Sequence, residues 1–139
     1  MAGLMSRNKG KRGEREVIVL MQPVVDEVYG LHQLESPQLK RNTLQSDGGG
    51  SDIAGLPWLA VEVMYCQTFS IGRWWRQALE QAGGEREPVL LYRRNNAPWS
   101  VMMYGMLGGM GLGYQVPVIV GIEPFLAWFR LRLNQELEG

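Results

Sequence analysis

The sequence predicts an α/β fold in which a mixed central β-sheet is flanked by helices. The chain begins with a segment of helical periodicity. Strand-like segments at 52–64, 88–92 and 99–104 then lie on either side of a second helical pattern at 71–82. An initial helix followed by strand, strand, helix and strand favours a mixed sheet with helices packed against it. The length of 139 residues and the hydrophobic content of 45% indicate one globular domain.

The formal net charge is zero, which argues against a basic surface that coats nucleic acid over the whole molecule. Basic residues nevertheless concentrate near the N-terminus, and we predict a flexible basic arm at residues 1–12 that contacts phosphate. A solvated, frayed terminus is the alternative. The single cysteine, Cys66, excludes an intramolecular disulfide and a cysteine-based zinc site. The first apolar run is too short for a signal peptide, so we expect a location in the cytoplasm of the host or source cell.

The first predicted helix runs from Gly13 to about Tyr29. At the helical period, Glu14 projects into the apolar stripe, whereas Glu16 lies on the polar face. A carboxylate that faces the interior is costly unless it is paired, so Glu14 is a candidate functional residue. A favourable interaction with the helix dipole is the alternative explanation. The stripe consists of Val17, Ile18, Met21, Val24, Val25 and Val28.

A second anomaly lies at residues 46–64, where a glycine-rich loop precedes a short strand, a turn and a mostly apolar strand. A hairpin centred on Pro57 places Asp52 opposite Glu62, with Cβ atoms about 4.5–5.5 Å apart, and Met64 falls on the same face. Opposed carboxylates repel each other, and a bound divalent cation would explain the arrangement. A register shift of one residue would turn Glu62 away from Asp52.

These motifs, Gly-Gly-Gly-Ser-Asp-Ile and Val-Glu-Val, together with Arg-Gly-Glu-Arg-Glu-Val near the N-terminus, resemble the metal-binding core of the PD-(D/E)XK nucleases. The spacing is most similar to archaeal-type Holliday junction resolvases and related phage endonucleases, over roughly residues 8 to 95. The resemblance implies a restriction-endonuclease-like core. It also implies that Glu14, Asp52 and Glu62 are catalytic and bind Mg²⁺ or Mn²⁺. A homodimer acting on branched DNA in recombination is the function implied.

The sequence departs from that pattern at one position. The family has a lysine two residues after the glutamate, and this chain has Met64, which carries no charge and no hydrogen-bond donor. Lys40 or Lys11 could supply the cation from another element, or the enzyme could be slow and rely on metal alone. The alternative function is a catalytically impaired nuclease-fold protein that binds DNA or takes part in an assembly.

Basic residues outside the arm add candidate DNA contacts. Lys40 and Arg41 lie in a possible strand at 38–45, and Arg73 and Arg76 lie on the polar face of the helix at 71–82. They could equally be solvated surface residues. Ser46 is included because the resembling resolvases often have a serine near the catalytic centre. The predicted DNA-binding residues are Lys9, Lys11, Arg12, Lys40, Arg41, Ser46, Arg73 and Arg76.

The chain carries no charge from Ala97 to Ile122 and is rich in Met and Gly there. We predict that residues 105–139 form a glycine-rich loop, a strand at 116–121 and a terminal helix at 123–137. The glycines, Gln115 and Pro117 argue against a membrane-spanning helix. The terminal helix is more apolar than a peripheral helix requires, which favours a homodimer interface.

Overall fold

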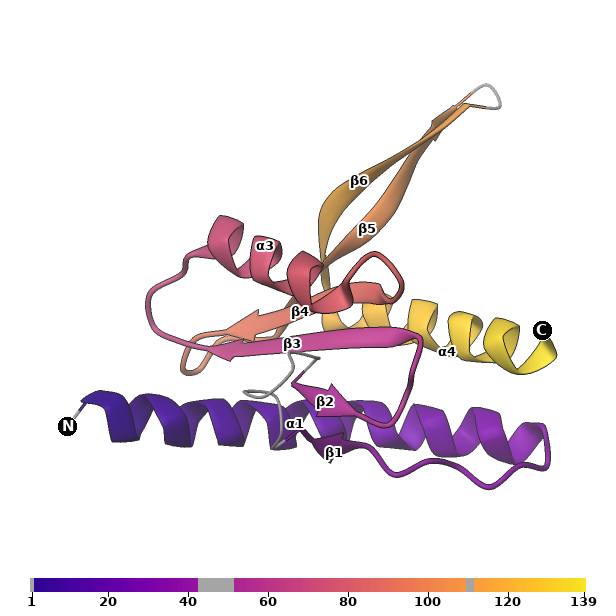
Figure 1. Cartoon of the computed structure of the whole chain (residues 1–139), viewed down its shortest axis with the longest axis horizontal. Coiled ribbons are helices and arrows are strands. Elements are labelled where there is room, and N and C mark those ends of the chain that lie inside the picture. Colours follow the sequence, from indigo (N-terminus) through magenta and orange to yellow (C-terminus); the bar gives the residue numbers. More distant parts are fainter. Residues whose placement is uncertain (1, 43–51, 110–111) are drawn as a thin grey trace.

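The computed structural model describes residues 2–42, 52–109 and 112–139. Within them, six strands form one sheet in the order β1-β2-β3-β4-β5-β6, with α1 and α4 on one face and α3 on the other (Figure 1). The α/β prediction with a mixed sheet flanked by helices is confirmed. The elements are α1 (Ala2–Leu31), β1 (Lys40–Arg41), β2 (Ile53–Ala54), β3 (Leu59–Tyr65), α3 (Ile71–Ala82), β4 (Glu87–Arg93), β5 (Ser100–Gly109), β6 (Leu112–Gly121) and α4 (Ile122–Glu138).

The centre of the sheet is the parallel pair of β3 and β4, which α3 connects, and the other neighbouring strands are antiparallel. Helices cover both faces of β3, so that Leu59–Val63 is buried without the alternation of a half-exposed strand. A side chain on β3 therefore faces protein on whichever side it points.

Helix α1 begins at Ala2, so the prediction of a flexible arm at 1–12 is wrong for residues 2–12. Gly13, which looked like the start of the helix, is an interior position. A Cβ atom there would lie 3.2 Å from the Tyr65 Cβ and 3.3 Å from the Val63 Cγ1. The glycine thus lets the helix backbone approach β3 closely. The predicted apolar stripe is confirmed, since Val17, Met21, Val24, Val25 and Val28 are all buried.

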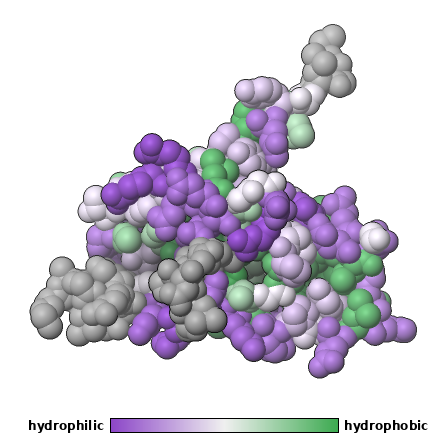
Figure 2. Space-filling model, in the orientation of Figure 1, coloured by the Kyte–Doolittle hydropathy of each residue, from purple (hydrophilic) through white to green (hydrophobic). Residues whose placement is uncertain are grey.

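The predicted glycine-rich loop is also corrected, because most of it is strand. Strands β5 and β6 pair from Ser100↔Gly121 to Gly109↔Leu112 and form a hairpin that stands clear of the body (Figures 1 and 2). Gly105 is required by this pairing, because a Cβ there would lie 2.8 Å from a methyl group of Val118. Met106, Leu107 and Tyr114 on the hairpin are exposed.

Helix α4 packs beside α1 and buries Phe125, Phe129 and Leu133 completely. Most of its apolar character is therefore used inside the chain, which removes the main sequence argument for a dimer interface on this helix. Leu131 is the exception and is 68% exposed. Among the described residues, no helix has the length and hydropathy needed to cross a membrane.

Phe129→Ala is expected to lower the free energy of unfolding by about 3–5 kcal/mol, because it removes a fully buried ring. The matched variant Leu131→Ala, on the exposed side of the same helix, should change the free energy of unfolding by less than about 0.5 kcal/mol. Urea denaturation measures both. Equal effects would contradict the packing of α4 described above.

Candidate active site

The turn between β2 and β3 sets the register that brings two carboxylates together. Ile53 pairs with Val61, so Asp52 lies opposite Glu62, as the hairpin centred on Pro57 predicts. The Asp52 backbone N–H donates to the Val61 carbonyl oxygen at 2.7 Å. The Val63 N–H donates to Asp52 Oδ2, also at 2.7 Å. The Asp52 side chain is therefore fixed against β3 beside Glu62.

Glu62 is completely buried, and among the described residues neither of its carboxylate oxygens has a hydrogen-bond partner. Burial raises the pKa of Glu62 to about 9, and the negative charge of Asp52 adds to this effect. A protonated Glu62 can also share its proton with Asp52, which further favours the neutral form. A buried carboxylate without a donor is unfavourable for folding. Its presence here points to binding or catalysis as the reason it is kept.

Glu14 comes from α1 and joins this pair electrostatically. Its pKa is raised, first by burial and also by the charge of Asp52, while a hydrogen bond from Arg41 opposes the shift. The Arg41 Nε donates to Glu14 Oε1 at 2.8 Å. Glu14, Asp52 and Glu62 thus come together in one region, where the charge of Asp52 raises the pKa of Glu14 and of Glu62, and the charge of Glu14 raises that of Glu62.

The possible ligands for Mg²⁺ in this region are the carboxylate oxygens of Glu14, Asp52 and Glu62. In the described part of the chain, no group of three or more His, Cys, Asp or Glu side chains is arranged to hold a metal ion. Arg41 already binds the Glu14 carboxylate, which leaves Asp52 and Glu62 as the close pair. Mg²⁺ usually takes only one or two carboxylates, with water and phosphate oxygens for the rest. The chemistry of the two Glu62 oxygens, which lack donors, and of the adjacent Asp52 therefore fits Mg²⁺ or Mn²⁺.

Met64, which stands where the resembling nucleases have a lysine, is half-buried against the apolar cluster of α3 that includes Trp74 and Trp75. The cation that contacts Glu14 is Arg41, on the edge strand β1. The sequence predicted Arg41 as a DNA contact, and Lys40 or Lys11 as the source of a cation in place of the lysine. Lys40 is exposed on β1, and the charge of Lys11 on α1 lowers the pKa of Glu14.

The remaining predicted DNA contacts are dispersed. Arg12, Arg73 and Arg76 are exposed, and the two on α3 line a shallow hollow with Gln77 and Glu80. Ser46 and the glycines at 48–50 lie outside the described residues, as does the side chain of Lys9.

Glu16, expected on the polar face of the helix, is half-buried there and paired with two arginines. Arg93 Nη1 donates to Glu16 Oε1 at 2.8 Å, and Arg12 Nε lies 3.3 Å from Oε2 in ion-pair contact without hydrogen-bond geometry. The spacing of Arg12 and Glu16 by four residues was a signal for their pairing. No local pattern identifies Arg93, which lies 77 positions away in the sequence.

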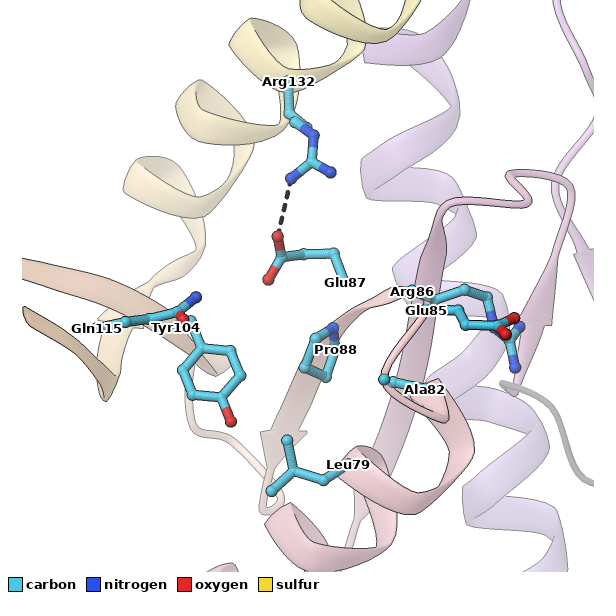
Figure 3. A pocket seen from close by; sticks show the side chains of 10 residues that line it. Leu79, Ala82, Glu85, Arg86, Glu87, Pro88, Tyr104, Gln115 and Arg132 are labelled. Atoms are coloured by element: carbon cyan, nitrogen blue, oxygen red, sulfur yellow. Dashed lines mark hydrogen bonds and ion pairs between the residues drawn. The ribbon is translucent and has the colours of Figure 1, made fainter.

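A pocket of about 410 Å³ lies between the end of α3, the start of β4, the hairpin and α4 (Figure 3). It contains none of the three carboxylates. Of its two acids, Glu85 and Glu87, the second accepts a hydrogen bond from Arg132 Nη1 at 2.8 Å, which offsets its charge. The pocket offers no group poised for chemistry, so the candidate site remains the carboxylate region.

Comparison of the chain with models of protein families, with curated proteins and with solved structures finds no match. The interpretation of the site therefore depends on its residues and geometry.

Without divalent metal, the free energy of unfolding should fall as the pH rises from about 5 to about 9. The unfolded chain loses the Glu62 proton near its ordinary pKa of 4.5, whereas the folded chain keeps it to about 9, so the folded state binds the extra proton between these values. Glu62→Gln should remove this slope and be more stable than the wild type at pH 8 by roughly 1–4 kcal/mol. Urea denaturation in EDTA measures the effect, with the exposed Glu80→Gln as control. A wild-type slope that persists in Glu62→Gln would contradict the assignment.

Proposed function

We propose that this chain is a Mg²⁺-dependent DNA endonuclease that cuts branched DNA such as Holliday junctions. The observation that carries the proposal is the buried Glu62 carboxylate, without a hydrogen-bond donor, opposite Asp52. Nothing in the packing of β3 calls for an acid at this position, whereas hydrolysis of a phosphodiester calls for carboxylates that hold a cation. The choice of branched DNA rests on the resemblance of the motifs to resolvases.

In this proposal Asp52 and Glu62 hold the metal ion, and Glu14 holds Arg41 in place. When bound, Mg²⁺ or Mn²⁺ would withdraw charge from the phosphate and lower the pKa of a water molecule. The Val63 N–H keeps Asp52 in one orientation. Arg41 uses its Nε for Glu14, and its planar guanidinium has further N–H groups that could donate to a phosphate oxygen.

A homodimer belongs to the same proposal, since two sites related by a twofold axis could cut opposing strands of a junction. The exposed apolar residues of the β5–β6 hairpin and Leu131 supply surface for such a contact.

A catalytically impaired nuclease-fold protein that binds DNA or joins an assembly is the second candidate. Met64 favours it, because this side chain packs with Trp74 and Trp75 and places no positive charge beside Glu62. The two candidates differ in whether Arg41 can take over the role of the absent lysine.

The wild-type protein should cut a labelled four-way junction when Mg²⁺ or Mn²⁺ is added, and cut a matched linear duplex less. The same ions should raise its melting temperature, because they bind the folded state only. Asp52→Asn should abolish both effects, since it removes one of the two proposed ligands. Metal-dependent stabilisation without cutting would favour the impaired candidate, and neither effect in the wild type would refute the metal site.

Arg41→Ala should reduce junction cutting by a factor of about 10²–10³, the usual effect of removing one group that stabilises charge in a transition state. Lys40→Ala, the exposed neighbour on β1, is the control and should retain activity. Single-turnover cleavage rates measure both variants. A different result would be that Arg41→Ala cuts the junction normally while Met64→Lys cuts it much faster than the wild type does. The site would then be eroded, and Arg41 would not replace the absent lysine.

A further inference from the structure

A second cleft, of about 490 Å³, lies between the N-terminal half of α1 and the carboxyl end of β4 (Figure 1). Its volume falls in the range of about 300–1,000 Å³ that is common for ligand sites. The side chains of Arg12, Arg15 and Arg93 line it together with the apolar residues Val19, Leu20 and Trp99. The proposed metal site uses none of these residues.

The cleft lies on the opposite flank of α1 from Glu14. Residues advance by about 100° around a helix, so Glu16, which also lines the cleft, lies about 200° from Glu14. The contacts agree with this placement, because Glu14 pairs with Arg41 on β1, whereas Glu16 pairs with Arg93 on β4. The helix thus separates a partner in the cleft from the carboxylates of the candidate active site, and their charge does not exclude an acidic partner.

Arg93 forms an ordered wall of the cleft. Its Nη1 donates to Glu16 Oε1 at 2.8 Å, and its guanidinium carbon lies 4.8 Å from the centre of the Tyr65 ring and 5.7 Å from that of Trp99. Trp99 beneath it is 6% exposed, so its ring offers no open face on which a base could stack. The cleft presents instead a fixed guanidinium, whose planar N–H donors match the oxygens of a carboxylate.

The described residues that line the cleft carry more positive than negative charge. Glu16 is the one carboxylate among them, and it already contacts both Arg12 and Arg93. Arg15 is exposed. The formal net charge of the whole chain is zero, so a polyanion such as DNA gains little long-range attraction from it. The positive charge is local, and it suits one or two carboxylates at short range.

The apolar surface of the cleft that is open to solvent is aliphatic. Val19 is 71% exposed on α1, and Leu20 beside it is half-buried. An aliphatic side chain placed there would remove apolar surface of both partners from water, which favours the contact. A sugar-phosphate backbone carries no such group. Exposed aliphatic surface next to three arginines therefore matches an acidic segment of protein that also carries an aliphatic side chain.

We propose that this cleft binds a short acidic segment of a partner protein, in which acidic residues flank one aliphatic residue. The aliphatic side chain lies on Val19 and Leu20, and the carboxylates bind Arg12, Arg15 and Arg93. The interaction is independent of the proposed function, because it uses the other flank of α1 and needs neither metal nor DNA.

The test measures binding of two fluorescein-labelled, end-capped peptides in EDTA by fluorescence anisotropy: Glu-Glu-Leu-Glu-Glu and the equally charged Glu-Glu-Ser-Glu-Glu. The wild type should bind the leucine peptide about tenfold more tightly, because burial of one leucine side chain supplies at least that factor. Val19→Asp should bind both peptides with similar, weakened affinity. Arg15→Glu should weaken the binding of both by a similar factor and leave their ratio unchanged.

Val19 and Arg15 are exposed, so these substitutions should preserve the fold. Arg130→Glu on α4 is the matched charge control and should bind both peptides as the wild type does. Equal wild-type affinity for the two peptides, or binding of neither, would overturn the proposal, as would normal binding by Val19→Asp and Arg15→Glu. A thymidine oligonucleotide of equal charge that displaces the leucine peptide at a lower concentration than the unlabelled peptide does would assign the cleft to nucleic acid and also overturn it.

Discussion

The candidate site depends on one constraint, which is that β3 holds a carboxylate inside the protein. Both faces of β3 are covered by helices, Glu62 is completely buried, and its two oxygens lack donors among the described residues. An apolar residue would serve the fold better. The surrounding cores on the two faces of the sheet must therefore stabilise the strand enough to tolerate the acid, and the register with Asp52 then concentrates negative charge beside it. Such a concentration is characteristic of functional sites.

The two parts of the site that sequence reasoning found follow from local rules. The turn at Pro57 fixes the pairing of residues on either side of it, and the period of two along each strand then places Asp52 and Glu62 together. The helical period placed Glu14 among apolar neighbours in the same way. Short-range geometry determines these positions, so they could be predicted without knowing the rest of the fold.

The parts that were missed depend on contacts between segments distant in the sequence. Glycine lowers helix propensity, which made Gly13 look like a boundary, yet its lack of a side chain lets α1 approach β3. The glycines of the hairpin suggested a loop, but pairing over ten residues on each strand outweighs their low strand propensity. The pairs Arg41–Glu14 and Arg93–Glu16 join residues 27 and 77 positions apart, so no local pattern identifies them.

Met64 and Arg41 together show why a missing lysine is weak evidence for a missing charge. The face of β3 that carries residue 64 packs against the tryptophans of α3, where an ammonium group would need a partner to offset its desolvation. Methionine suits that apolar contact. Arg41 reaches Glu14 from the edge strand, where its side chain stays 26% exposed and its charge is neutralised by Glu14. Within the proposed function, Arg41 would supply the positive charge from the edge of the sheet, at a lower cost of burial than a lysine at position 64.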